Sequence, residues 1–234
     1  MRRLRPCWTG SGIVGLDAGR VRTLRDGADD LRVSGREAQL SQPPAASCCP
    51  TAVELVEPTL DRLPGYAAAL DTGWSPSTTR DVSAEQLAAL RADADGFLRG
   101  LTQRKGGGTI ASADGTMVPR LPGRVLWLWD GAFCGAINLR FVPGTLDLPP
   151  HVSGHVGYAV VPWKRGRGYA TQALALLLPV ACELGLPRVL VTCDASNAAS
   201  RRVIEANGGV LADTISYPDR PGYHKLLFWI ATAT

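Results

Sequence analysis

The residues whose types and spacing best suit chemistry lie between 155 and 170, where the sequence reads HVGYAVVPWKRGRGYA. An apolar run leads into a proline, then into two glycines and three cations, and then into a helix-like run. The glycines, Gly166 and Gly168, would let an anion approach the backbone closely. The start of the helix would add unpaired N–H groups and the positive end of its dipole. This pattern predicts a site for a cofactor that carries phosphate.

The flanking sequence predicts the elements that hold this loop in place. In chain order these are a buried strand over 155–161, a helix over 169–184 and a second buried strand over 188–194. Gly185 and Pro187 are expected to end the helix, because neither residue continues one easily. A strand, a helix and a further strand of the same sheet form a parallel, right-handed crossover.

The rest of the chain predicts a sheet that is antiparallel in its N-terminal half. Asp130-Gly131 is a strong hairpin signal between the strand-like runs 124–129 and 132–142. A capping box that begins at Ser83 predicts one helix whose apolar positions continue to Leu101. The remaining predicted elements are a strand over 53–56, a helix over 61–70, a helix over 198–206 capped by Asn197 or Ser196, and strands over 210–216 and 224–231. The expected fold class is therefore α/β, in the sense of a mixed α+β sheet.

Composition narrows the class of protein. The chain has 234 residues and a net charge of +4. Residues 1–50 contain eight Arg and five acidic residues and show no helical or strand periodicity, so we expect them to be disordered or an extension upstream of the domain. Residues 51–234 carry 17 cations and 16 anions, which argues against a nucleic-acid surface. We expect this part to form one domain, as a monomer or a homodimer.

The same counts indicate a compartment. No apolar run reaches the roughly 18–20 residues that span a bilayer, so we expect no membrane segment. The six cysteines include no Cys-x-x-Cys pair, and no signal peptide is visible, which favours a reducing cytoplasm.

Two kinds of phosphate site combine a strand, a glycine loop and a helix. The first is the dinucleotide turn, which Gly166-x-Gly168-x-x-Thr171 nearly spells, with Asp194 as the acid for a ribose. However, residues 162–165 separate the strand from the first glycine, and only 40 residues follow Asp194. Those 40 residues are too few for the remaining strands of a doubly wound sheet.

The second kind of site is carried by a resemblance. The run from Arg165 to Ala170 resembles the pattern Arg/Gln-x-x-Gly-x-Gly/Ala of the GNAT superfamily of acyl-CoA-dependent N-acyltransferases. Residues 158–162 look like the fourth strand of that family, and Asn197-x-x-Ser200 resembles its Asn-x-x-Ala/Ser after the fifth strand. The resemblance covers roughly residues 53–231 and is strongest from 154 to 209, where a Gly-His-Val-Gly-Tyr strand and an Asn-Gly-Gly ending are similar to a bacterial subgroup of acetyltransferases.

The resemblance implies a GNAT-like fold with splayed central strands and acetyl-CoA as co-substrate, without a metal. The backbone N–H groups from Arg165 to Ala170 would take the pyrophosphate, Lys164 would help to offset its charge, and the pantetheine arm would lie between the splayed strands. The implied cofactor-binding residues are Tyr158, Val160, Val161, Arg165, Gly166, Arg167, Gly168, Tyr169, Ala170, Thr171, Asn197 and Ser200.

In the family, transfer to a primary amine is direct, within a ternary complex. Its general acid is often a Tyr seven residues after the Asn, and here that position is Ile204. His155 is our candidate for the base, because an unperturbed imidazole titrates near pH 6.5. The loop 143–154 and the strands after 210, together with the helices between 61 and 101, would form the pocket for a small-molecule amine or another amino group.

Two other functions stay open at this point. Ile204, in place of the usual acid, allows a non-catalytic acyl-CoA-binding or regulatory module. The glycine spacing allows, less favourably, a dinucleotide-binding oxidoreductase.

Overall fold

A computed structural model describes residues 52–232 except residues 79, 113–114 and 218–219. The chain divides into two units, Met1–Ser47 and Cys48–Thr234, and every described residue belongs to the second. The prediction for residues 1–50 lies outside the described residues.

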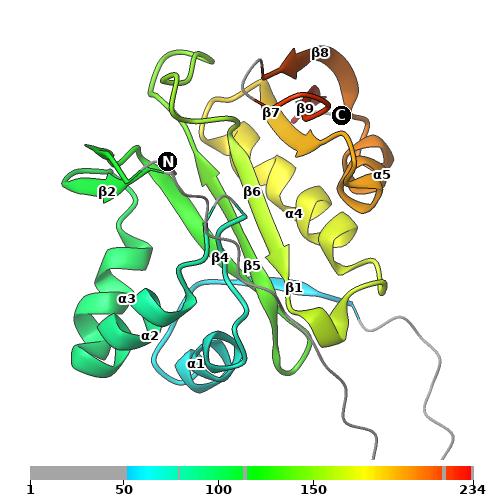
Figure 1. Ribbon diagram of the computed structural model, residues 1–234. Coiled ribbons are helices and arrows are strands. Elements are labelled where there is room, and N and C mark those ends of the chain that lie inside the picture. Colours follow the sequence, from blue (N-terminus) through cyan, green and yellow to red (C-terminus); the bar gives the residue numbers. More distant parts are fainter. Residues whose placement is uncertain (1–51, 79, 113–114, 218–219, 233–234) are drawn as a thin grey trace, which may run out of the picture. The chain divides into compact units, whose positions relative to one another are not determined.

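The described unit is built on a seven-stranded mixed sheet, as predicted (Figure 1). Its strand order is β1-β4-β5-β6-β7-β9-β8, and every neighbouring pair is antiparallel except β6 and β7, which are parallel. The strands are β1 (Glu54–Val56), β4 (Gly123–Trp129), β5 (Phe133–Arg140), β6 (Val156–Val160), β7 (Arg188–Asp194), β8 (Val210–Ser216) and β9 (His224–Ala231).

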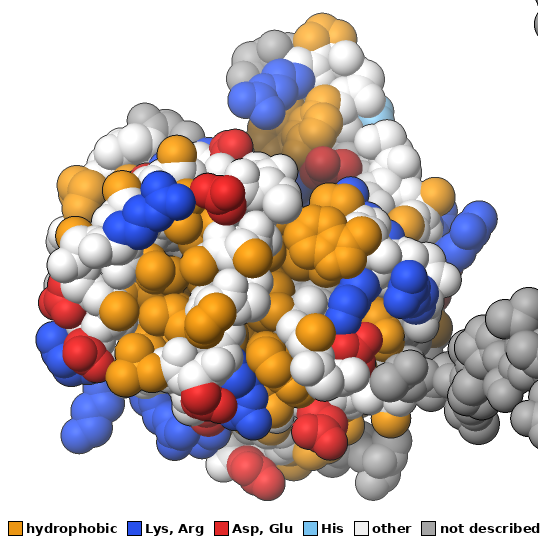
Figure 2. Space-filling view, turned by 90° about the horizontal axis from the view of Figure 1, so that it is seen from below, with side chains coloured by type: hydrophobic (Ala, Val, Ile, Leu, Met, Phe, Trp, Pro, Cys, Tyr) orange, Lys and Arg blue, Asp and Glu red, His pale blue; other side chains and the backbone are white. Residues whose placement is uncertain are grey.

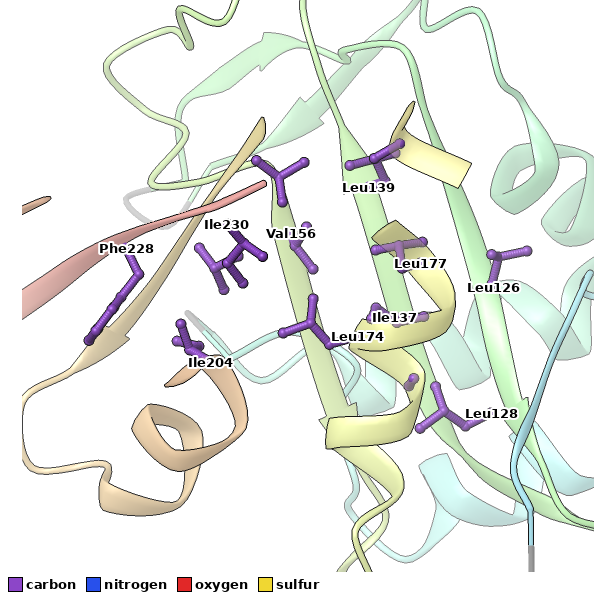
Figure 3. Packing of buried hydrophobic residues seen from close by; sticks show 14 of the residues in the cluster. Leu126, Leu128, Ile137, Leu139, Val156, Leu174, Leu177, Ile204, Phe228 and Ile230 are labelled. Atoms are coloured by element: carbon purple, nitrogen blue, oxygen red, sulfur yellow. The ribbon is translucent and has the colours of Figure 1, made fainter. Parts of the chain in front are cut away.

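Helices cover both faces of this sheet (Figure 1). One face packs against α1 (Leu63–Asp71), α2 (Ser83–Ala92) and α3 (Ala94–Thr102), and its core includes Trp127 and Phe133. The other face packs against α4 (Tyr169–Glu183) and α5 (Ala198–Ala206). Figure 3 shows Leu174 and Leu177 of α4 beside the sheet residue Ile137. Strand residues alternate between the two faces, so β4, β5 and β6 contribute to both cores, whereas the buried residues of β7 and β9 all belong to the core under α4 and α5.

The crossover helix α4 begins at Tyr169 as predicted and ends one residue before the predicted Leu184. Its end is a Schellman motif: the Gly185 N–H donates to the Cys182 carbonyl and the Leu186 N–H donates to the Ala181 carbonyl. Gly185 has φ +81°, a conformation that glycine adopts without strain. In the described part of the chain, no helix has the length and apolarity needed to cross a membrane.

The segment after residue 82 differs from its prediction. The predicted single helix is divided at Asp93, which has extended backbone angles and accepts the Gly96 N–H as the N-cap of α3. Ser83 lies inside the first turn of α2 rather than capping it, and Asp81 accepts its N–H. A short hairpin of β2 (Thr109–Ala111) and β3 (Met117–Pro119) also escaped the sequence analysis, because three-residue strands carry almost no periodicity.

Candidate functional site

The loop between β6 and α4 has the backbone of an anion site. A one-turn 3-10 helix, η1 (Pro162–Lys164), leads into Gly166 and Gly168, whose φ angles are +75° and +77°. The first intrahelical bond of α4 runs from the Gln172 N–H to the Gly168 carbonyl. The N–H groups of residues 169–171 therefore precede the first acceptor of the helix and point out of its N-terminus. A Cβ at Gly166 would meet no atom within 4 Å, so the loop is open to a ligand.

The loop is anchored at both ends by one carboxylate. Lys164 Nζ, before the glycines, lies 2.6 Å from Asp130 Oδ1 in the β4–β5 turn. The hydroxyl of Tyr169, after the glycines, donates to Asp130 Oδ2 at 2.6 Å. Burial by itself would raise the pKa of Asp130, but these hydrogen bonds outweigh it and lower that pKa to about 2. The carboxylate is therefore ionised at any physiological pH and holds both flanks of the loop.

This anchor changes the expected role of two residues. Lys164 was expected to offset phosphate charge, but its side chain is turned inward and also donates to Cys134 Sγ at 3.3 Å. Tyr169 is likewise buried, so only its backbone N–H faces the loop. The exposed cations that remain at the loop are Arg165 and Arg167. Figure 2, which looks onto this end of the unit from below, shows cationic side chains spread among acidic and apolar ones.

The two parallel strands beside the loop diverge, as predicted. β6 pairs with β5 along its length, whereas it meets β7 at a single register pair, Val156 and Val191. Peptide groups alternate between the two sides of a strand, and the Val161 N–H donates to the Cys134 carbonyl of β5. Tyr158 lies three residues before Val161 and Val160 one residue before it, so both direct their backbone groups to the opposite side, into the gap before β7.

Val161 was expected to bind the pantetheine arm together with Tyr158 and Val160. The structure separates it from them, because its N–H is occupied by β5 and its side chain is fully buried. Val160 also contacts the loop directly, because its carbonyl accepts a hydrogen bond from Arg165 Nε at 3.1 Å.

Asn197 and Ser200 lie across the gap, at the start of α5. Asn197 caps this helix, with Oδ1 accepting the Ser200 N–H at 2.9 Å. The hydroxyl of Tyr158 lies 2.8 Å from Ser200 Oγ, which links the free side of β6 to α5. The two motifs therefore meet at one gap.

Comparison with known proteins agrees with this geometry. The family described as "Acetyltransferase (GNAT) domain" matches residues 76–210, more than half of the chain. The chain belongs to the GNAT acetyltransferase family. It is therefore an acyl-CoA-dependent acetyltransferase by family. No curated protein sequence matches it.

Solved structures are similar to this GNAT protein at low identity. An acetyl transferase of Salmonella typhimurium that modifies the N-terminal serine of ribosomal protein L7/L12 is 15% identical, with TM-score 0.50, 77% of this chain and 95% of that chain covered. The yncA acetyltransferase of the same organism, solved with acetyl-CoA, is 15% identical, with TM-score 0.45 and coverage of 78% and 95%. A GNAT-family protein of Bordetella pertussis is 19% identical, with TM-score 0.48 and coverage of 76% and 95%.

His155 does not face the site of this GNAT domain. Its side chain is fully buried, and its Nδ1 accepts the Leu190 N–H of β7 at 3.0 Å. Burial, and then the charge of Arg140, lower the pKa of His155 to about 4. An imidazole that is enclosed and hard to protonate is badly placed to take a proton from an ammonium. Its side chain instead joins the start of β6 to β7, at the end where the two strands are still paired.

Ile204 is fully buried in the core beneath α5, so the usual acid position of the GNAT family is filled by packing (Figure 3). Asp130 is the site residue that the sequence analysis missed. Asp-Gly is such a strong turn signal that it explains Asp130 without any partner, and its partners are 34 and 39 residues away. An acidic residue in a turn can also serve as an ionic anchor, but this role leaves no local pattern in the sequence.

Proposed function

We propose that this GNAT domain transfers an acetyl group from acetyl-CoA to a primary amine by direct transfer in a ternary complex. The observation that carries the proposal is the continuity of two features on one strand. The unpaired side of β6 ends at Val160, and the anion loop begins five residues later at Arg165. A single ligand with phosphates at one end and an amide-bearing arm fits both.

The residues present suit coenzyme A. Its pyrophosphate would meet the N–H groups at the start of α4 and the side chains of Arg165 and Arg167, which are exposed there. The backbone groups of Tyr158 and Val160 would pair with its arm as an added strand. When bound, acetyl-CoA supplies an activated acyl group as a thioester, and the Val160 N–H would polarise its carbonyl.

The reaction balances without a covalent enzyme intermediate. The amine nitrogen forms a bond to the thioester carbonyl carbon, and the bond from that carbon to sulfur breaks. The nitrogen gives up one proton and the departing thiolate takes one. Ile204 has no ionisable group and His155 is buried, so neither position can take the proton from the nitrogen or give one to the thiolate. We infer that water carries these protons and that the enzyme acts mainly by holding the two reactants together.

One observation favours a second candidate, a module that binds acyl-CoA without catalysis. The buried Ile204 removes the acid that the family commonly uses. Turnover separates the two functions, because a binding module would release no thiol above the uncatalysed rate with any amine.

The binding half of the proposal is tested by titrating acetyl-CoA calorimetrically into wild type, Gly168→Glu and Gly185→Glu. Both glycines have positive φ, so both variants carry the same kind of backbone strain, but Gly185 lies at the far end of α4. We expect Gly168→Glu to weaken binding by about tenfold or more, roughly 1.4 kcal/mol, because its carboxylate would face the phosphates. Equal affinities for wild type and Gly168→Glu would sink the assignment of this loop.

A further inference from the structure

A pocket of about 300 Å³ lies between the loop 142–154 and the strands β7 to β9. Leu148 and Val152 of the loop form one wall, and Ile215 of β8 forms another. Leu227 and Trp229 of β9 form the floor. This pocket is separate from the anion loop, and none of the cofactor-binding residues proposed above lines it.

The pocket lies on the face of the sheet opposite α4 and α5. Leu226, Phe228 and Ile230 of β9 are buried in the core under those helices, and Figure 3 shows Phe228 and Ile230 on that side. Because side chains alternate along a strand, Leu227 and Trp229 project to the other face. The anion loop, at the start of α4, therefore belongs to one face and the pocket to the other.

The gap between β6 and β7 opens next to residues that line the pocket. Beyond the pair Val156 and Val191 the two strands separate, and β7 continues as one wall of the gap. Leu190, which precedes Val191 on β7, lines the pocket, and so does Leu227, the β9 partner of Thr192. A donor bound at the loop and lying in the gap would thus present its acyl group to the face that carries the pocket.

The chemistry of the walls selects the acceptor. Most lining side chains are aliphatic or aromatic, so an apolar body in the pocket buries apolar surface, whereas a polar body would lose part of its hydration. Asp147 lies in the lining and can attract an ammonium group, while Lys225 also lines the pocket and disfavours a second positive charge. The volume is at the small end of ligand pockets and suits one ring or a short aliphatic chain.

We propose that this pocket binds the acceptor, and that the acceptor is a small monoamine carried on an apolar or aromatic body. The proposal rests on the proposed acetyl transfer and names its substrate class. Sugars with an amino group and polyamines are poor acceptors on this basis.

The first test measures thiol release from acetyl-CoA with four amines: phenethylamine, hexylamine, putrescine and glucosamine. We expect kcat/KM for the two apolar amines to exceed that for the two polar ones by about tenfold or more, the discrimination that an apolar pocket gives. A preference for putrescine or glucosamine would overturn the pocket proposal while leaving acetyl transfer intact. Release with none of the four would overturn it too, and calorimetry with acetyl-CoA then shows whether the donor site also fails.

The second test fills the pocket. Ile215→Trp adds volume inside the lining, and Leu211→Trp makes the same kind of change on the same strand outside it. Both parent side chains are partly exposed, so both variants are expected to fold, which thermal melting checks. We expect Ile215→Trp alone to raise the KM for phenethylamine by about tenfold, with the KM for acetyl-CoA unchanged. Equal effects of the two variants would overturn the proposal.

A third variant addresses the charge. Asp147→Asn should raise the KM for phenethylamine severalfold and lower its dependence on salt, because the ammonium loses its counter-charge. Asp213→Asn on β8 lies outside the lining and serves as the matched control. An effect of Asp213→Asn as large as that of Asp147→Asn would mean that only the general surface charge matters, which contradicts a specific anchor.

Discussion

Asp130 has two functions at the residue scale, because the same side chain occupies a hairpin turn and fixes a binding loop. Its two oxygens hold Lys164 on one side of the glycines and Tyr169 on the other. Glycines make the loop able to approach a phosphate, but they also make it flexible in the absence of other contacts. An ionic anchor that spans the glycines reduces that freedom before the ligand arrives, which lowers the entropic cost of binding.

This argument predicts the effect of Asp130→Asn. The variant leaves the ammonium of Lys164 nearly buried without a counter-charge, and such a loss costs roughly 3 kcal/mol of unfolding free energy. The KM for acetyl-CoA should rise because the loop is less ordered before the ligand binds. The KM for the amine should not change. Asp71→Asn, which removes an exposed ion pair with Arg91, should cost less than about 1 kcal/mol. Urea unfolding and steady-state kinetics measure both effects, and equal costs for the two variants would contradict the anchor.

At the scale of elements, the important feature is that β6 has one side that is largely unpaired, although the strand lies in the middle of the sheet. Tyr158 and Val160 direct peptide groups into the gap, whereas the Val161 N–H is bonded to Cys134. A strand that is paired on one side and open on the other can accept an additional strand, and an amide-bearing arm can take that place. The single pair Val156 and Val191 keeps the gap closed at one end only.

Amide hydrogen exchange tests this alternation. In the free protein the Val160 amide should exchange much faster than the Val161 amide, although the two are neighbours, because only the second is bonded to the sheet. Saturating acetyl-CoA should slow exchange at Val160 and leave Val161 unchanged. Equal protection of the two amides in the free protein would show that the gap is closed.

At the scale of the whole described unit, stability and site geometry depend on the same junction. Helices α4 and α5 cover one face of the sheet, α1 to α3 cover the other face at β4 and β5, and the gap interrupts the sheet in the centre. His155 is enclosed beside this interruption, where Nδ1 accepts the Leu190 N–H from β7. Because Nδ1 is the acceptor, the neutral ring carries its proton on Nε2, and protonation of Nδ1 would remove the bond.

The pH dependence of stability follows from this burial. The pKa of His155 is lowered to about 4 in the folded state, whereas an unfolded histidine titrates near 6.5. Between these values the unfolded chain binds one proton more than the folded chain. The unfolding free energy should therefore fall by about 1.4 kcal/mol for each unit of pH lost from 6.5 towards 4. Above pH 6.5 the contribution is complete.

His155→Asn provides the comparison, since its Oδ1 can accept the Leu190 N–H but does not titrate. The difference between wild type and this variant should carry the slope, as measured by urea unfolding from pH 4 to 8. His151→Asn, which changes an exposed histidine, should leave the slope in place. A slope that persists in His155→Asn would assign the pH dependence to other groups.

Some elements have the bounds predicted from the sequence and others do not, for physical reasons. β7 and α5 have the predicted bounds, because each is a complete pattern that ends at a turn or a cap. The prediction of one helix over residues 83–102 was wrong, because the helical spacing of apolar residues continues across Asp93 even though the helical backbone stops there. Local periodicity records which side chains face the core and does not record where a helix restarts at a new angle.

The candidate site shows the same division. Residues 154–209 by themselves determined the order strand, glycine loop, helix and strand, and with it the family and the location of the loop, because backbone freedom and helix ends are local properties. Only the tertiary structure decided that Lys164 faces Asp130 rather than phosphate, that His155 is enclosed, and that Val161 is turned towards β5. These outcomes depend on contacts across 27 residues or more and on the parity of strand pairing, and both are set by how the elements pack.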